Sequence, residues 1–176
     1  MILVRAEVVK NIKSTMENKT KNKYIYPVKV DDSVKITRDE SPAHVDNLKY
    51  SVDFIMEEGR EVFVALDGVV VDIKTDSEIG GESQKLDELG NFIEIKHDND
   101  EYSIYEHLKK DGSVVEIGDK VKQGQVIGHS GATGWLAHLG PHLHFMVGKY
   151  ADEAMDYSTY ETLEIIWDKS IDSGNR

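Results

Sequence analysis

The chain has 176 residues, and 21 Lys and Arg against 33 Asp and Glu give it a formal net charge of −12. This balance argues against binding to nucleic acid or anionic lipid, both of which need clustered cations, while 39% apolar and 31% charged residues are typical of a globular chain. There is no Cys, which excludes disulfides, thiolate zinc sites and cysteine nucleophiles, so metal ligands must come from His, Asp and Glu.

The N-terminal part predicts short strands and no targeting segment. The first apolar run ends at Arg5, far short of the ~7–15 apolar residues of a secretory signal or the ~20 of a membrane helix. Residues 2–9 and 24–30 are rich in β-branched and aromatic residues, which predicts strands. The polar residues 13–23 predict a loop or a short helix, and residues 31–47 an irregular segment.

From residue 49 onward, short alternating apolar runs are separated by turns that contain Gly, Asp or Asn. This pattern predicts an all-β fold, an antiparallel sheet or sandwich. The polar residues 75–90 predict a long loop of the kind that is often functional or mobile, and residues 157–167 a strand, with a helix as the alternative. The other expected strands are 50–55, 61–66, 69–74, 91–96, 102–105, 114–117, 126–127 and 143–147.

The strongest local feature is the pair His142 and His144. Side chains two residues apart on a strand share a face, so both imidazoles project together while Leu143 and Phe145 face a core. Two adjacent imidazoles are costly to desolvate without a partner, and a divalent metal or a catalytic arrangement solves this problem. The alternative is a pair of half-exposed His on an edge strand.

A carboxylate lies on a second alternating segment. Tyr50, Val52 and Phe54 share one face there, and Asp53 lies on the other with Ser51. His and Asp ligands with an open position for water are the usual composition of a catalytic zinc site, although Fe²⁺ or Mn²⁺ would also fit these ligands.

An ordered series of blocks over about residues 42–148 resembles the lysostaphin-type, LytM-like zinc metallopeptidases, which are peptidoglycan endopeptidases. The final blocks, Ser130 to Gly134 and Gly140 to Phe145, are the most specific. The resemblance implies an all-β LytM-like fold of the duplicated hybrid-motif type with an extra N-terminal segment. The blocks are His44 and residues 50–54, 58–62, 67–70, 90–93, 105–108, 118–121, 124–128, 130–134 and 140–145.

The resemblance also implies the site. The positions that match the family's metal ligands are His44, Asp53 and His144, and one Zn²⁺ per chain would activate a water. The positions of its catalytic pair are His107 and His142, of which we expect His142 to be the base and His107 to donate to the oxyanion. The implied activity is zinc-dependent endopeptidase hydrolysis of a peptide or peptidoglycan substrate.

The implied organisation has three parts: an N-terminal extension over residues 1–40, a catalytic domain over 41–150, and a C-terminal extension over 151–176 that packs on the domain. The family resemblance suggests an extracellular or cell-envelope location, although no signal peptide is expected in this chain. Neither a nucleic-acid partner nor a membrane segment is expected, and the sequence leaves the oligomeric state open.

One spacing departs from the family pattern. The family usually has three residues between the first His ligand and the Asp, which here would select Lys49, whereas His44 lies nine residues before Asp53. A protonated Lys cannot bind zinc. A subgroup with a longer connection and a Tyr-x-x-Asp-Phe block fits residues 50–54.

Two other classes remain open. The block from Gly118 to Gln125 also resembles turns of lipoyl-like and phosphocarrier modules, but no acceptor Lys has a convincing context and a phosphocarrier would not need His44 or Asp53. A non-hydrolytic binding relative of the same fold is the other alternative. Three further side chains carry structural or surface expectations: His97 (structural), His138 (surface or substrate contact) and Tyr105 (a packed aromatic with a satisfied hydroxyl).

Overall fold

The computed structural model describes residues 18–38, 41–136 and 138–168, so the strand expected at residues 2–9 lies outside the described residues. Within these ranges the chain forms strands and 3₁₀ turns and no α-helix, and no helix there is long and apolar enough to span a membrane. The strands are β1 (Lys19–Tyr24), β2 (Lys35–Thr37), β3 (Val52–Ile55), β4 (Glu61–Phe63), β5 (Gly68–Lys74), β6 (Gly80–Gly81), β7 (Phe92–Lys96), β8 (Tyr102–Glu106), β9 (Lys120–Val121), β10 (Val126–His129), β11 (Gly134–Trp135), β12 (His142–Lys149), β13 (Glu161–Thr162) and β14 (Glu164–Trp167). The 3₁₀ turns are η1 (Asp46–Leu48), η2 (Gln84–Leu89), η3 (Asp98–Asp100) and η4 (Tyr157–Thr159).

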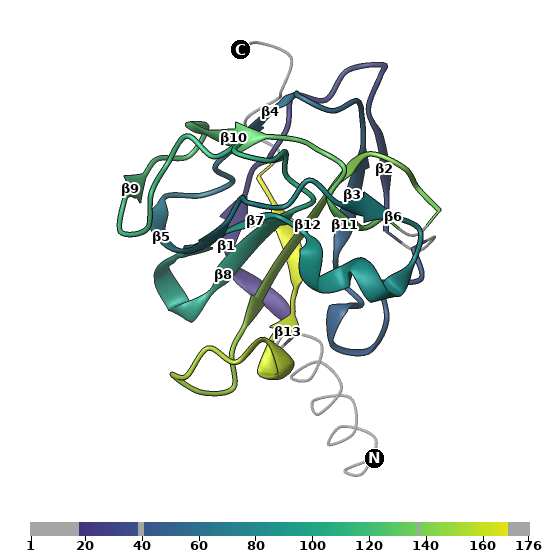
Figure 1. The fold of residues 1–176 in the computed structure, drawn as a ribbon. Coiled ribbons are helices and arrows are strands. Elements are labelled where there is room, and N and C mark those ends of the chain that lie inside the picture. The colour runs from purple at the N-terminus through teal and green to yellow at the C-terminus, as the bar shows by residue number, and fades with distance from the viewer. Residues whose placement is uncertain (1–17, 39–40, 137, 169–176) are drawn as a thin grey trace, which may run out of the picture.

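An eight-stranded antiparallel sheet forms the centre of the molecule, which confirms the predicted all-β architecture. Its strand order is β2-β3-β12-β8-β7-β5-β9, and β13 pairs with the far end of β12. The antiparallel pair β4–β10 lies at one end of the view in Figure 1 and β13 at the other. The two remaining pairs, β1–β14 and β6–β11, are parallel.

One face of the sheet carries the main hydrophobic core. Phe54 on β3, Tyr105 on β8 and Phe145 on β12 are fully buried and belong to one apolar cluster. Val62 and Ile127, from the β4–β10 layer, complete this cluster, so the two layers pack as a sandwich. The alternation of β12 therefore places Leu143 and Phe145 in the core, as the sequence predicts.

Three sequence predictions are wrong in detail. The predicted strand at 24–30 stops at Tyr24, because Pro27 has no N–H for a ladder and the chain instead contacts the β4 region through isolated bonds such as Phe63 N–H to the Pro27 carbonyl. Residues 19–23, predicted as a loop or helix, form most of β1. Residues 114–117 form no strand, since Val114 and Ile117 face solvent.

The described parts of the two terminal segments pair with each other. β1 runs parallel to β14, and the carboxylate of the fully buried Glu101 accepts hydrogen bonds from the backbone of Lys21 (2.5 Å) and Asn22 (3.3 Å) and from the Tyr24 hydroxyl (2.9 Å). The polar residues of β1 form a strand because this carboxylate and β14 satisfy their backbone.

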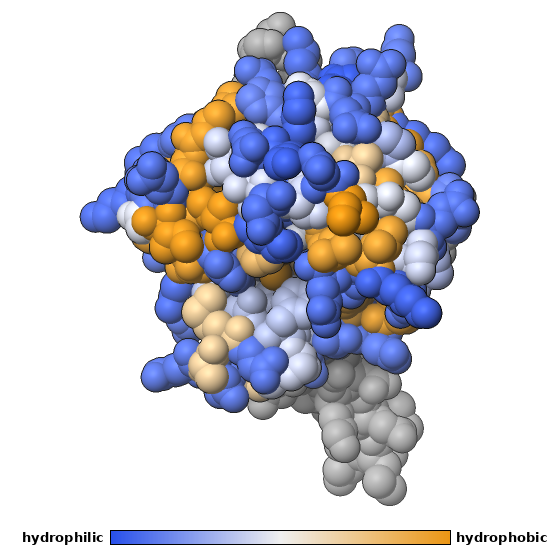
Figure 2. All heavy atoms as spheres, viewed as in Figure 1, coloured by the Kyte–Doolittle hydropathy of each residue, from blue (hydrophilic) through white to orange (hydrophobic). Residues whose placement is uncertain are grey.

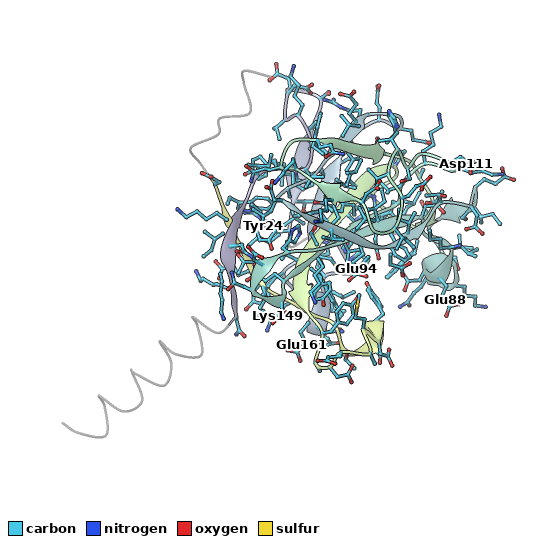
Figure 3. The ribbon with its side chains drawn as sticks, turned by 90° about the vertical axis from the view of Figure 1, so that its left-hand side faces the viewer. Tyr24, Glu88, Glu94, Asp111, Lys149 and Glu161 are labelled. Carbon is cyan, nitrogen blue, oxygen red and sulfur yellow. The ribbon has the colours of Figure 1, made fainter. Side chains whose placement is uncertain are left out.

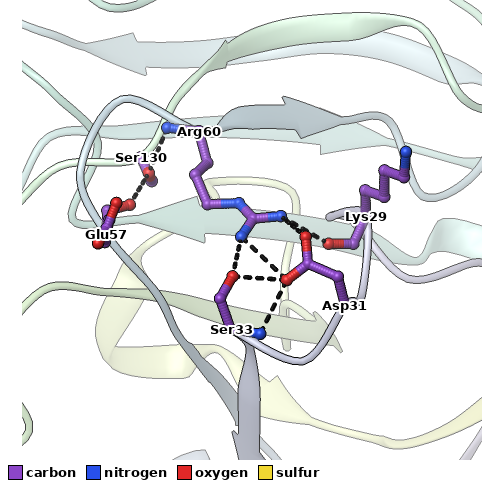
Figure 4. Close-up of polar contacts among 6 residues, drawn as sticks. All are labelled: Lys29, Asp31, Ser33, Glu57, Arg60 and Ser130. Atoms are coloured by element: carbon purple, nitrogen blue, oxygen red, sulfur yellow. Dashed lines mark hydrogen bonds and ion pairs between the residues drawn. The ribbon is translucent and has the colours of Figure 1, made fainter.

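A second polar network holds the connections that precede β2 and β4 (Figure 4). The Arg60 guanidinium donates to both carboxylate oxygens of Asp31 (3.2 and 2.7 Å) and to the Lys29 carbonyl (3.1 Å). The hydroxyl of Ser130 accepts from Arg60 N–H (3.0 Å) and donates to the Glu57 carbonyl (2.9 Å). A separate hydrogen bond, from Met56 N–H to the Pro141 carbonyl (3.4 Å), holds the end of β3 beside the segment that leads to His142.

Candidate metal centre

Strand register places Asp53 beside His144. The two residues are directly opposite each other on β3 and β12, so their side chains leave the same face of the sheet, away from the main core. His144 Nδ1 lies 2.7 Å from Asp53 Oδ1, and both side chains are almost completely buried. This geometry follows from the alternation predicted for both strands.

His44 reaches the same point from the segment before η1. Its Nδ1 lies 2.5 Å from the Arg38 carbonyl, so Nδ1 carries the proton and Nε2 presents a lone pair. Nε2 lies 3.2 Å from Asp53 Oδ2. Lys49, at the family's usual position, is exposed instead, with Nζ 4.9 Å from the centroid of the Tyr50 ring. The longer connection therefore still delivers an imidazole to Asp53.

Three donor atoms converge in a way that fits a bound metal. One atom each from His44, Asp53 and His144 lie within 4.8 Å of one another. His44 Nε2 and Asp53 Oδ2 are buried without hydrogen-bond partners, a costly state that a cation would relieve. Ligands of a tetrahedral zinc, about 2.1 Å from the ion, are separated by about 3.4 Å, close to the 3.2 Å between these two atoms.

His107 and His142 form a second pair at the edge of this centre. Their ring centroids are 4.5 Å apart, and His142 Nε2 lies 3.7 Å from Asp53 Oδ1. β8 ends at Glu106, and strict alternation would turn His107 toward the core. A φ of 63° at His107 breaks the alternation and directs the ring toward His142. Positive φ is uncommon for His, and such strain clusters at functional sites.

Backbone carbonyls set the tautomers of this pair. His107 Nδ1 lies 2.8 Å from the Thr133 carbonyl, and His142 Nδ1 lies 2.8 Å from the Gly140 carbonyl. A carbonyl only accepts, so each ring carries its proton on Nδ1, and in the neutral state Nε2 can only accept. Sequence reasoning missed these orienting groups, because no side-chain pattern marks a carbonyl.

Burial and mutual proximity control the charges. Burial lowers the pKa of His107 well below its usual value, and the neighbouring His142 and His144 lower it further. Burial also lowers the pKa of His142, partly offset by the Asp53 carboxylate. Burial by itself would raise the pKa of Asp53. The three surrounding imidazoles outweigh this effect and hold the pKa of Asp53 far below the usual range. Near neutral pH Asp53 is therefore ionised, while His107 and His142, which lie beside the His44–Asp53–His144 cluster, are neutral.

The remaining predictions for His and Tyr side chains can now be compared with the structure. His97 is buried between the Asp67 carbonyl (2.9 Å) and the Ser103 hydroxyl (2.8 Å), which confirms its structural role. Tyr105 is a core aromatic whose hydroxyl accepts from Ala65 N–H, also as expected. His138 is exposed.

Comparison with known proteins identifies the family. A family model described as peptidase family M23 matches residues 47–157, more than half of the chain. The chain belongs to peptidase family M23. The predicted resemblance to the lysostaphin-type, LytM-like enzymes of this family is therefore confirmed. The match covers Asp53 and the His107, His142 and His144 segments, and it begins after His44.

Among M23 relatives, the peptidoglycan DD-endopeptidase ShyC of Vibrio cholerae is 35% identical over 53% of this chain and 18% of its own length. The structure of the antimicrobial peptidase lysostaphin from Staphylococcus simulans aligns with a TM-score of 0.51 and 31% identity, covering 74% of this chain and 47% of that one. The structure of a zinc-containing peptidase from Vibrio cholerae aligns with a TM-score of 0.50 and 30% identity, and the alignment covers 71% of this chain and 36% of that one. The chain thus spans about a quarter or less of the length of the first curated relatives that it matches.

Proposed function

We propose that this M23 chain is a zinc-dependent endopeptidase that hydrolyses peptide bonds in peptidoglycan cross-links or stem peptides. The observation that supports it most strongly is the buried Asp53 carboxylate, which contacts two imidazoles while one of its oxygens and His44 Nε2 lack hydrogen-bond partners. The zinc-containing relative and the peptidoglycan endopeptidase relatives support the choice of metal and substrate.

In this proposal His44, Asp53 and His144 hold one Zn²⁺. When bound, the ion would supply Lewis acidity and lower the pKa of a water toward neutrality. The Arg38 carbonyl keeps the His44 ring oriented by accepting from Nδ1, the kind of outer contact that fixes a ligand's tautomer.

His142 is the proposed base. Its Nε2 has a lone pair and lies 3.7 Å from the Asp53 carboxylate, so it can take a proton from a water at the centre and pass it to the leaving amine. Protonation gives Nε2 a hydrogen that can donate to the developing oxyanion.

His107 was expected to be the oxyanion donor, but its hydrogen bonding favours another task. With Nδ1–H directed to Thr133 and a lowered pKa, neutral Nε2 accepts rather than donates. We propose that it accepts from the attacking water or a substrate N–H and orients that group for reaction.

The proposed domain division follows the sequence prediction, with a catalytic domain at 41–150 and extensions on either side. Its support is that β1 and β14, one from each extension, pair with each other, and that β13 adds to β12 of the main sheet. Each extension would thus also contribute a strand to the main sheet, β2 beside β3 from the N-terminal one and β13 from the C-terminal one.

The direct test is incubation of the zinc-loaded protein with purified peptidoglycan of two cross-bridge types, with and without a chelator. We expect soluble fragments with new amino termini from at least one type, abolished by the chelator and restored by Zn²⁺. Absence of cleavage of both types by a protein shown to contain zinc would reject the substrate assignment.

A further inference from the structure

A cavity of about 440 Å³ lies on the same face of the main sheet as the metal centre. Its floor is formed by strands β5, β7 and β8, and its walls by the η2 segment on one side and the segment 150–157 on the other. Figure 3 shows Glu88 on the η2 turn and Glu94 on the sheet. The η2 wall belongs to residues 75–90, for which the sequence predicts a long loop of the kind that is often functional or mobile.

The cavity adjoins the proposed catalytic residues. Glu106 lines it and is directly opposite His144 in the β8–β12 register, so the two side chains leave adjacent strands on one face. Gly90 also lines it, and a Cβ at Gly90 would lie 3.8 Å from His107 Nδ1. A peptide that reaches the metal centre can therefore extend into this cavity.

The charged groups that line the cavity all have the same sign. Five carboxylates contribute to it, and no Lys or Arg does among the described residues: Asp72, Asp87, Glu88, Glu94 and Glu106. Glu94 is 4% exposed, and burial raises its pKa to about 7, with the carboxylates of Asp72 and Glu106 acting in the same direction against a hydrogen bond from Tyr150. Burial also raises the pKa of Asp87 and of Glu106, so part of the lining can be protonated near neutral pH. An ammonium group in the cavity would favour the ionised form of these carboxyl groups, because no Lys or Arg lines it among the described residues.

The spacing of these carboxylates argues against a second metal ion. Among the described residues, the groups whose donor atoms could converge on one ion are the two clusters of the catalytic centre, and neither includes a cavity carboxylate. A cavity that is acidic but dispersed fits an organic cation better. The rings of Tyr150 and Tyr157 also line it and can face an ammonium group.

We propose that this cavity is a substrate subsite for a primary ammonium group carried by the peptide, either on a side chain or at its amino terminus. The inference rests on the proposed peptidase function and specifies which peptides that site prefers. Glu94 at the floor and Asp87 on η2 would bind the ammonium group from two sides, and charge-assisted hydrogen bonds give such contacts their strength.

Binding is tested with a zinc-loaded His107→Ala variant, in which turnover is expected to be about 10²–10⁴-fold slower and the peptides therefore to last through the titration. The probes are blocked hexapeptides of alanine with one Lys at each position in turn, each paired with the same peptide carrying Nε-acetyl-lysine, and an unblocked hexa-alanine. In isothermal titration, at least one Lys peptide should bind about tenfold more tightly than its acetyl-lysine partner, or the unblocked hexa-alanine about tenfold more tightly than the same peptide with a blocked amino terminus. Which of the two arms responds identifies the source of the amine.

Matched variants assign the effect to the cavity. In the same background, Glu94→Gln with Asp87→Asn should reduce the preference to less than about threefold, since both substitutions keep shape and remove charge. Asp87→Asn alone, on the exposed face of η2, gives an intermediate value even where the double variant unfolds. Glu61→Gln, an exposed carboxylate on β4 in the other layer, should leave the preference unchanged.

The outcomes separate this inference from the proposed function. Equal binding of charged and neutral peptides at every position, undetectable binding of all of them, or a preference that survives the double variant would overturn the subsite. Hydrolysis of neutral peptides by the wild-type protein without an amine preference would leave the peptidase assignment standing and remove only the subsite. A binding preference for the amine without any hydrolysis by the wild-type protein would support the subsite and count against the peptidase assignment.

Discussion

The two faces of the main sheet are built from the same strands but serve opposite physical purposes. On β12, Leu143 and Phe145 enter a closed apolar core, while His142 and His144 enter a polar centre on the other side. The core face gains stability from burying apolar surface. The other face buries imidazoles and carboxylates, some without partners, beside a smaller apolar cluster that includes Ile104 and Met146. One strand thus carries fold and chemistry independently, and substitutions on the two faces should have separable effects.

The surface around these layers fits the acidic composition. Figure 2 shows hydrophilic side chains over most of one face, with apolar side chains in separate patches. Exposed acidic side chains such as Glu88 and Asp111 have an ordinary role in solvation. The acidic cavity is different, because its Glu94 is buried on the sheet rather than solvated.

The largest expected effect separates the site face from the core. Asp53→Ala should lower turnover by at least about 10³-fold and abolish stoichiometric zinc, because it removes the carboxylate that contacts His44 and His144. Elemental analysis and peptidoglycan hydrolysis measure the two effects. Ser51→Ala is the matched control, since Ser51 Oγ is buried without a partner and its loss should leave zinc intact. Full zinc content in Asp53→Ala would contradict the ligand assignment.

The second effect distinguishes catalysis from metal binding on the same face. His142→Ala and His107→Ala should each lower kcat by about 10²–10⁴-fold, the usual range for a lost proton-transfer group, with zinc content unchanged. Kinetics on zinc-loaded samples, with zinc quantified for each, provide the measurement. If both variants keep near-wild-type turnover, the proposed roles of this pair are wrong.

The third effect belongs to the core face. Phe145→Ala should lower the free energy of unfolding by about 3–5 kcal/mol, because the ring is fully buried between the layers. Urea denaturation of metal-free protein measures this loss, and zinc binding at low temperature should persist. Leu139→Ala, a half-buried position outside the core cluster, should cost much less. Equal losses at both positions would remove the contrast between the faces.

A smaller effect appears in the pH dependence of stability. His97 is buried, and burial lowers its pKa in the folded chain despite its bond to the Asp67 carbonyl. Below about pH 6.5 this His therefore takes up a proton in the unfolded chain but not in the folded chain. The free energy of unfolding falls as the pH drops below this value, by at most about 1.4 kcal/mol per pH unit for each such group. Unfolding of metal-free protein between pH 5 and 8 should show a shallower slope in His97→Gln; an identical slope would count against His97 as a source.

Much of this architecture could be predicted from sequence because strand alternation is a local property. The faces of Leu143, His144 and Asp53 follow from a period of two and the register that hydrophobic burial imposes. The strand at 19–24 could not be predicted, since its partners are β14 and the distant Glu101. The φ of His107 and its carbonyl partner Thr133 likewise depend on tertiary contacts.

The acidic cavity was missed for a different reason. Tyr105 faces the core, so alternation alone would have placed the side chain of its neighbour Glu106 on the opposite face, beside His144. Its neighbours Asp87 and Glu94, however, come from separate elements, and only the folded chain brings them together.

The smallest expected effect tests the unusual spacing before Asp53. Lys49→Ala should change neither zinc content nor turnover, because Lys49 is exposed and directed over the Tyr50 ring. His44→Ala should weaken zinc binding strongly, since it removes the lone pair that faces Asp53 Oδ2 at 3.2 Å. Zinc affinity by competition with a chelating dye compares the two variants directly. The opposite ranking would mean that the ligand at this end of the site is not His44, and that the connection through η1 has no part in presenting it.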